Sequence, residues 1–447
     1  MIEMNSKPIE QLDHFLMATY RPAEVRFVRG EGTYLFDETG KRYLDFLSGI
    51  AVCSLGHAHP AIADALCEQA RTLLHVSNLY RNELAPRLAY ELDLLIGGGT
   101  TEVGGRVFFA NSGAEANEAA IKLARAWGGP SKYVVVSTVG SFHGRTLATL
   151  HATGQVEKHR PFQPLPEGFR HVAYDDLEAL EIRLHDSDVA AVLVEAVQGE
   201  AGVIQPSAGY LRGVRKLCDE HGVLLIVDEI QTGLGRTGSW FAFQHEGIVP
   251  DIVTVAKALG NGVPIGACWA KPEVAAAFQP GYHGSTFGGQ PLAAAAALAT
   301  LKVMRDEVVT ERAVRRGEQL KRQLKDIPGV KDVRGKGLLL AAVLEEGISS
   351  TTVADAALKE GLVINAVASE AIRLAPPLLV SEDEVDQACR ILTKVLSSIS
   401  SSDGSVAEEL DSGSEQRLSW SERGPGQLPL ESGTAGREEI ISEETSD

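Results

Sequence analysis

Three short stretches of the sequence hold residue types that suit chemistry on a bound cofactor. Asp228 follows a markedly apolar stretch, residues 223–227, where a carboxylate is costly unless a cation pairs with it. Lys257 comes just after the predicted strand 251–255. Residues 111–115, Asn-Ser-Gly-Ala-Glu, join a predicted strand to a predicted helix, where free N–H groups and the helix dipole favour an anion.

Together these residues suit pyridoxal phosphate. This cofactor needs a lysine for a covalent imine, an acid beside its pyridine nitrogen and a backbone cradle for its phosphate. Taken singly, each feature has an ordinary explanation: Asp228 could cap a turn, residues 112–113 could simply start a helix, and Lys257 could be a surface residue. Their joint position at the carboxyl ends of predicted strands, where open α/β sheets bind ligands, favours the cofactor.

The other motifs give weaker evidence for a nucleotide site or a metal site. Residues 233–238 match G-x-G-x-x-G but do not open a clear helix, so a dinucleotide site is only weakly indicated. No G-x-x-x-x-G-K-[ST] phosphate loop occurs in the sequence. His57 and His59 have no accompanying acid–His set, so we interpret them as part of a structural turn and expect no metal.

The elements that must position these residues form an α/β pattern between residues 106 and 271. Short, nearly continuous apolar runs alternate with amphipathic segments such as 115–127 and 209–221, as expected for strands buried on both faces of a parallel sheet. The predicted strands are 106–110, 133–137, 171–174, 189–197, 223–227, 251–255 and 266–270.

The pattern changes after Pro291. A long helix is predicted over 292–326, with a break near Asp306. Strands are then predicted over 333–344 and 362–374, on either side of a helix over 352–361. Ser381 and Glu384 form a capping box that starts the last predicted helix. This part therefore indicates a smaller α+β domain.

We expect four parts in the chain. Residues 1–60 form an N-terminal segment that packs with the small domain, 61–290 a large cofactor-binding domain, 291–400 the small domain, and 401–447 a disordered acidic tail. The tail holds 12 acids and three arginines, half of the net charge of −18, and too few apolar residues to offset ordering entropy. A peptide that binds a partner through Trp420 or Ile440 is the alternative.

Composition excludes several classes of partner. The acidic balance disfavours nucleic acid and anionic membrane surfaces, which need clustered Lys and Arg. No apolar run approaches the roughly 18 residues of a membrane helix. The five cysteines are scattered and no signal peptide is visible, so a cytoplasmic protein is expected.

A series of motifs follows the chain in a fixed order. They are 30–32 GEG, 56–60 GHAHP, 111–118 NSGAEANE, 142–146 FHGRT, 198–202 QGEAG, 228–233 DEIQTG, 256–260 AKALG, 283–289 HGSTFGG and 372–377 IRLAPP. Between about Tyr20 and Leu396 the sequence resembles the class III aminotransferases, and within them the acetylornithine-type enzymes of bacteria. The resemblance implies the fold-type I architecture of pyridoxal-phosphate enzymes, with a mostly parallel sheet in the large domain and a smaller α+β domain.

The resemblance implies a role for each cofactor residue. Lys257 would bind the cofactor covalently and move the proton, Asp228 would keep the pyridine nitrogen protonated, and Phe142 would stack on the ring. Thr286 would reach the phosphate of the other subunit, which implies a homodimer. The full implied cofactor set is Gly113, Ala114, Phe142, Asp228, Glu229, Ile230, Gln231, Lys257 and Thr286.

The implied substrate site must accept two different groups. Arg373 would bind the α-carboxylate of glutamate, and Glu200 would neutralise that arginine when an ω-amine is bound instead. Arg145 would hold the distant carboxylate of the amino donor, with Tyr20 and Ser285 nearby. Ordinary surface ion pairs are the alternative explanation for the charged residues.

The implied reaction moves the ω-amino group of N2-acetylornithine to 2-oxoglutarate, giving glutamate, in arginine biosynthesis. Ornithine, succinylornithine and 4-aminobutyrate remain possible amino donors, and an aminomutase remains a possible reaction class. A non-catalytic binding protein is disfavoured by the intact Lys257 and Asp228. Two departures from the family pattern, Ala196 and Gln290, leave the local backbone and the substrate preference open.

Overall fold

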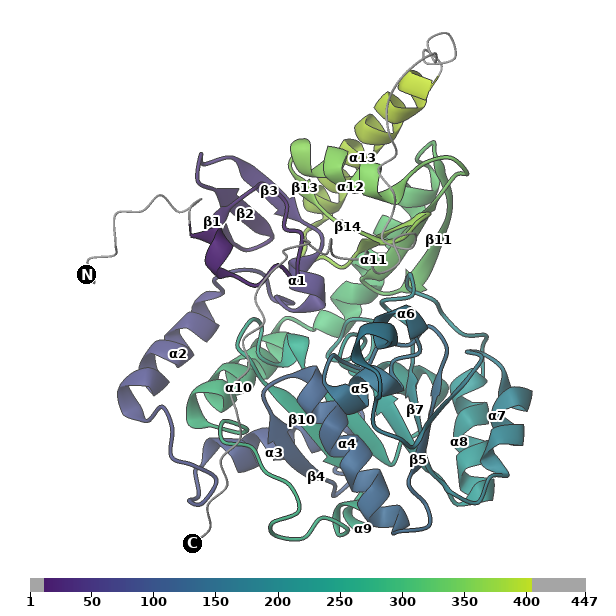
Figure 1. The fold of residues 1–447 in the computed structure, drawn as a ribbon. Helices are drawn as coiled ribbons and strands as arrows, with labels where there is room; N and C mark the ends of the chain where they lie inside the picture. Colours follow the sequence, from purple (N-terminus) through teal and green to yellow (C-terminus); the bar gives the residue numbers. More distant parts are fainter. Residues whose placement is uncertain (1–11, 404–447) are drawn as a thin grey trace, which may run out of the picture. The chain divides into compact units, whose positions relative to one another are not determined.

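The computed structural model describes residues 12–403 (Figure 1). A seven-stranded sheet with the order β4-β10-β9-β8-β7-β5-β6 lies at its centre. Strands β9, β8, β7, β5 and β6 run parallel, whereas β10 is antiparallel to both of its neighbours. The strands are β4 (Arg106–Ala110), β5 (Val134–Thr138), β6 (Phe169–Val172), β7 (Val189–Glu195), β8 (Leu224–Asp228), β9 (Ile252–Val255) and β10 (Gly266–Ala270).

This sheet confirms the predicted fold class. Each predicted strand of the α/β part is present, with its ends within two residues of the predicted place. Strands β5, β7, β8, β9 and β10 are buried along their whole length, because helices cover both faces, and this burial accounts for their continuous apolar sequences. In the register of β7 and β8, Glu195 lies opposite Asp228, so two acids end neighbouring strands at the same edge.

Helices cover the sheet. Helix α4 packs against β10 and β9, and α8 packs against β8 and α7. The predicted apolar face of α8 is buried through Leu211, Val214, Leu217 and Cys218. The helices are α2 (Pro60–Thr72), α3 (Leu84–Ile96), α4 (Gly113–Gly128), α5 (Leu147–Ala152), α6 (Val156–His159), α7 (Leu177–Leu184), α8 (Tyr210–His221) and α9 (Pro272–Ala275). Short 3-10 turns are η2 (Asp13–Phe15), η3 (Arg160–Phe162), η4 (Ala242–Glu246) and η5 (Lys257–Leu259).

The N-terminal residues form a second, small sheet. Strands β1 (Phe27–Glu31), β2 (Tyr34–Asp37) and β3 (Arg42–Asp45) pair antiparallel, and β13 (Leu362–Val363) joins β3 in parallel. The short helix α1 (Ser48–Ala51) follows. His57 pairs its backbone with Gly32, and its Nε2 lies 2.7 Å from Asp45 Oδ2. The hydrogen bond with Asp45 raises the pKa of His57 to about 9.

The C-terminal part contains a four-stranded antiparallel sheet and four helices. The helix predicted over 292–326 is broken as expected, into α10 (Pro291–Asp306) and α11 (Val309–Lys325), with Val308 in a left-handed conformation between them. The sheet has the order β11-β12-β15-β14. Its strands are β11 (Val330–Lys336), β12 (Leu339–Leu344), β14 (Asn365–Ala368) and β15 (Ala371–Leu374), and the remaining helices are α12 (Ser350–Lys359) and α13 (Glu382–Asp403).

Two strand predictions in this part were wrong. Residues 333–344 form a hairpin, because the chain turns at Gly337, where φ is +56° and a Cβ would lie 2.5 Å from the Arg236 carbonyl oxygen. Residues 362–374 form three short strands divided between two sheets. Continuous apolar residues conceal such turns, since both strands of a buried hairpin are apolar.

The last helix begins as predicted. Ser381 Oγ accepts from the Glu384 N–H over 3.2 Å, and Glu384 Oε2 accepts from the Ser381 N–H over 2.7 Å. Helix α13 ends at Asp403, three residues beyond the predicted end of the small domain, and the rest of the predicted tail lies outside the described residues. Within the described range, no helix has the length and apolar character needed to cross a bilayer.

Candidate active site

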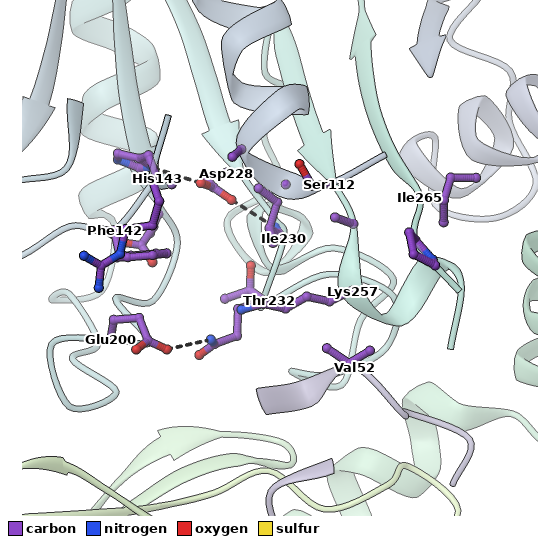
Figure 2. Close-up of a pocket in the computed structure, with 18 of the residues that line it drawn as sticks. Val52, Ser112, Phe142, His143, Glu200, Asp228, Ile230, Thr232, Lys257 and Ile265 are labelled. Atoms are coloured by element: carbon purple, nitrogen blue, oxygen red, sulfur yellow. Dashed lines mark hydrogen bonds and ion pairs between the residues drawn. The ribbon is translucent and has the colours of Figure 1, made fainter. Parts of the chain in front are cut away.

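A pocket of about 390 Å³ lies at the carboxyl ends of β7 and β8, beside the amino end of α4 (Figure 2). Val52 and Lys257 line it, together with residues of the segments 111–114, 142–145, 195–200, 228–232 and 262–265. Open α/β sheets bind ligands at the carboxyl ends of their strands. The strand order therefore gathers side chains that are far apart in the sequence.

Three contacts orient the buried carboxylate of Asp228. Asn117 Nδ2 donates to Oδ2 over 2.8 Å, and His143 Nδ1 lies 2.8 Å from the same oxygen. The N–H of Ile230 donates to Oδ1 over 3.0 Å. Figure 2 shows the carboxylate between His143 and Ile230. A carboxylate held in this way presents its remaining lone pairs in a fixed direction.

Asn117, which contacts Asp228, is itself held by further hydrogen bonds. Asn117 Nδ2 also donates to the His143 carbonyl oxygen, and Asn117 Oδ1 accepts from Thr254 Oγ1, each over 2.8 Å. His143 Nε2 is buried and has no partner within residues 12–403. The amide of Asn117 therefore links Asp228 to Thr254 of β9 and to the backbone of His143.

Lys257 extends into the same pocket. It starts η5 directly after β9 with a φ of 42°, a left-handed conformation that is uncommon for a residue with a Cβ. Burial lowers the pKa of its ammonium group, with Glu200 acting in the opposite direction and Arg373 adding to the decrease. A lysine with a lowered pKa more readily provides the neutral amine that acts as nucleophile or base.

The amino end of α4 offers an anion site. The Ser112 hydroxyl caps the helix by accepting from the Glu115 N–H over 3.2 Å. Gly113 and Ala114 form the first turn, whose N–H groups have no partner within the helix. A Cβ at position 113 would lie 2.8 Å from Ile230 Cδ1, so glycine allows the helix to approach the loop after β8.

Glu200, a half-buried residue that lines the pocket, forms an ion pair with Arg373, which is buried behind it. Arg373 Nη1 lies 2.5 Å from Glu200 Oε1, and it also donates to Gly199 O and Gln231 Oε1, each over 3.3 Å. Arg373 Nη2 is buried without a partner in the described part of the chain. Burial would raise the pKa of Glu200, but the charge of Arg373 and its hydrogen bond lower it overall.

Two cations lie over the ring of Phe142. The Arg145 guanidinium carbon is 5.7 Å and Lys158 Nζ is 5.5 Å from the ring centroid. The Phe142 N–H donates to Glu195 Oε2 over 3.0 Å, and this hydrogen bond holds the start of the segment 142–145. Burial lowers the pKa of Lys158, and Arg145 lowers it further, whereas Glu200 raises it. Two cations therefore lie beside Phe142, and of these Arg145 lines the pocket.

The remaining predicted residues do not line this pocket. Ser285 is linked to it only through Asn111, whose Nδ2 lies 3.1 Å from Ser285 Oγ. Thr286 and Tyr20 are exposed. Glu229 is buried behind the pocket, where it accepts from the Phe243 N–H over 2.9 Å and from Thr232 Oγ1 over 2.5 Å.

Sequence reasoning missed four residues of this arrangement, Asn117, His143, Lys158 and Glu195. Asn117 lies in the 111–118 motif, three residues after Ala114, and His143 directly follows Phe142, so their polar character within these motifs was the available signal. Lys158 has no such signal, because a single lysine near a short helix is indistinguishable from a surface residue.

The donors of the pocket fit pyridoxal phosphate. Asp228 offers an oriented carboxylate to a pyridinium N–H, the first turn of α4 offers N–H groups to a phosphate, and Lys257 offers an amine. His143 Nδ1 and Asn117 Nδ2 orient this acid, which itself lines the pocket. The pocket volume also lies in the range typical of small-molecule sites.

Comparison with known proteins identifies the family. Residues 16–396 match the model of the family described as Aminotransferase class-III. An acetylornithine aminotransferase of Corynebacterium efficiens is 48% identical over 388 residues, which cover 86% of this chain and 95% of that protein. One from Caldanaerobacter subterraneus is 46% identical over 393 residues, covering 86% and 98% of the two chains.

Solved structures give the same family. An ornithine aminotransferase of Toxoplasma gondii superimposes with a TM-score of 0.83 at 34% identity, covering 88% of this chain and 95% of that chain. A second structure of that enzyme is described with partial occupancy of pyridoxal phosphate (PLP) at its active site. An acetylornithine aminotransferase of Elizabethkingia anophelis superimposes with a TM-score of 0.77 at 35% identity, covering 87% and 98%.

Proposed function

This chain belongs to the class III aminotransferases, which are pyridoxal-phosphate-dependent transaminases, and on that premise we propose that it transfers the ω-amino group of N2-acetyl-L-ornithine to 2-oxoglutarate. The products are N-acetyl-L-glutamate 5-semialdehyde and L-glutamate, in arginine biosynthesis. The pair of the buried Arg373 with the half-buried Glu200 carries the proposal, because a site that alternates between an α-carboxylate and an ω-amine needs an arginine that can be neutralised.

When bound, pyridoxal phosphate accepts electron density from the substrate carbon that loses its proton. The chain's own residues prepare the site for that chemistry. We assign Asp228 to the pyridine nitrogen, with Asn117 and His143 holding the carboxylate in place. Gly113 and Ala114 would bind the phosphate through their N–H groups, and Phe142 would cover the ring.

Lys257 would hold the cofactor covalently and, once released, move the proton. Its pKa is lowered by burial, so the amine is available in neutral form to take a proton from the substrate carbon. Ile230 and Gln231, which line the pocket beside Asp228, would contact the ring face and the ring hydroxyl. Glu229 is placed further back and would act by holding the loop that carries them.

The substrate carboxylates would meet three cations. Arg373 would bind the α-carboxylate of glutamate or 2-oxoglutarate once Glu200 moves aside, and its Nη2, buried without a partner in the described residues, would be the second donor. Arg145 at the pocket mouth would hold the α-carboxylate of N2-acetylornithine. We add Lys158 to this role, because its ammonium shares the ring of Phe142 with Arg145 and no carboxylate pairs with it among residues 12–403.

We further propose a homodimer. Thr286 is exposed outside the pocket, so a phosphate contact from it would have to reach the site of a second subunit. Large apolar side chains on nearby segments are also exposed, as at a surface that a partner covers. They are Leu73, Leu74, Leu79, Tyr80, Tyr282 and Phe287. Ser285 and Tyr20 would then contribute to the substrate site of the assembled dimer.

The proposal places the reaction in the cytoplasm, since the five cysteines, which all lie in the described range, are unpaired. It is tested by steady-state kinetics with N2-acetylornithine, ornithine, succinylornithine and 4-aminobutyrate, each with 2-oxoglutarate. N2-acetylornithine is expected to give the highest kcat/KM, or one close to it. Ornithine is the main competitor, given the solved relatives, and a clear preference for any other donor would refute the substrate assignment.

A further inference from the structure

A cluster of metal-ligating side chains lies on the large sheet's outer helices, away from the pocket. It consists of Glu181, His185 and His221, whose carboxylate and imidazole ligand atoms all lie within 4.8 Å of one another. The two imidazole rings meet edge to face, with centroids 4.8 Å apart. Figure 1 shows α7 and α8, the helices that carry them, side by side.

The local structure explains why these residues meet. Glu181 and His185 are four residues apart at the end of α7, so they project from the same helical face. His221 is the last residue of α8, and His185 is the C-cap of α7. Both imidazoles therefore lie at helix C-termini, where the backbone carbonyl groups favour positive charge.

The three ligand groups are free to bind. None of them makes a hydrogen bond or an ion pair within residues 12–403. Glu181 and His185 are exposed and His221 is half-buried, so solvent reaches the cluster.

Most basic side chains near the cluster are already paired with acids, so they repel a cation only weakly. On the same helices, Arg183 pairs with Asp186 over 3.0 Å and Lys216 pairs with Glu220 over 3.6 Å. Lys132 opposes a cation, because it donates to Gly222 O over 3.4 Å, next to His221. Solvent around the exposed Glu181 and His185 screens that repulsion.

We propose that Glu181, His185 and His221 bind one divalent transition-metal ion of the zinc class. Two imidazoles and one carboxylate are a common zinc ligand set, and water would complete the tetrahedron. Ligand atoms in such a tetrahedron are about 3.3 Å apart, so separations of up to 4.8 Å must shorten by rotation of the side chains. None of the three residues lines the pocket. Because they come from α7 and α8, a bound ion would link the ends of these two helices.

The test is calorimetric titration of the purified full chain with ZnCl2. We expect one ion per chain, with affinity reduced at least about tenfold in both His185→Gln and His221→Gln. His14→Gln, which removes an exposed imidazole elsewhere, and Glu178→Gln, which removes a carboxylate of α7 outside the cluster, should bind zinc as the unsubstituted chain does.

Three outcomes would overturn the proposal. They are no binding to the unsubstituted chain, equal affinity in both histidine variants, or binding that is lost only in Cys67→Ser, which would place zinc at the exposed thiol. A thermal melt gives an independent check, since zinc should raise the melting temperature of the unsubstituted chain but not of His185→Gln. Neither result depends on transaminase activity, so this proposal and the proposed function can fail separately.

Discussion

Arg373 Nη1 lies 2.5 Å from Glu200 Oε1, while Nη2 of the same guanidinium is buried without a partner in the described residues. The arginine is almost fully buried, whereas the Glu200 side chain keeps 29% of its exposure. One partner of the pair can therefore move toward solvent, and the other cannot. This asymmetry is what a site requires when a substrate carboxylate replaces Glu200 in one half-reaction and Glu200 returns in the other.

We expect Glu200→Gln to impair the half-reaction with the ω-amine more than the half-reaction with glutamate. A neutral amide leaves Arg373 uncompensated when no substrate carboxylate is present, which we place at about 2 kcal/mol, or about thirtyfold in rate, since Glu200 is only partly buried. Single-turnover kinetics of each half-reaction measure this. Glu157→Gln, at an exposed site, is the control, and equal losses in both half-reactions would refute the switching role.

We expect His143→Gln to weaken binding of pyridoxal phosphate. The change disturbs a charge-assisted contact to Asp228 worth about 1.5–3 kcal/mol, or about tenfold to a hundredfold in Kd. Titration of the cofactor-free protein, followed by visible absorption, gives the Kd. Asn117→Ala should behave similarly, because its amide donates to the same oxygen. Unchanged affinity in both variants would mean that Asp228 does not depend on these contacts.

We expect Lys158→Met to raise KM for N2-acetylornithine about fivefold with a smaller change in kcat, because a half-buried cation contributes about 1 kcal/mol to carboxylate binding. Lys158→Arg keeps the charge and should retain most of the affinity. An amino donor without a carboxylate, such as an alkylamine, serves as the substrate control, since its KM should not change. A KM that responds equally for both donors would assign Lys158 a structural role.

We expect the stability of the protein to fall as pH rises through about 7, in part through Glu229. Burial raises the pKa of this carboxyl from its ordinary value of 4.5 to about 7. Because the folded-state pKa lies above the unfolded one, the contribution is fully present below about pH 4.5 and is lost as pH increases through 7.

Chemical denaturation at pH 6 and pH 8 tests this expectation with Glu229→Gln as the variant. The amide cannot ionise, so its free energy of unfolding should decrease less over this interval, by a difference of about 1 kcal/mol. Glu220→Gln, on the surface of α8, is the control. Parallel pH profiles in the Glu229 variant and the unsubstituted chain would show that this carboxyl does not titrate in the interval.

The sequence alone determined the main strands and the family. Continuous apolar runs such as 189–194 and 224–227 predict buried parallel strands, since they are short and rich in valine and isoleucine. The break before Val309 and the capping box at Ser381 were also predicted, because backbone caps depend on adjacent residues. These signals are local, because each depends on residues close together in the sequence.

Only the tertiary structure decided which side chains meet. Glu195 and Asp228 become neighbours through the register of β7 and β8, and Lys158 reaches Phe142 from a separate helix. The hairpin at Gly337 and the meeting of His185 with His221 likewise follow from packing between distant segments. Sequence patterns encode the burial of each element, but contacts between elements depend on strand order and helix packing, which no local pattern contains.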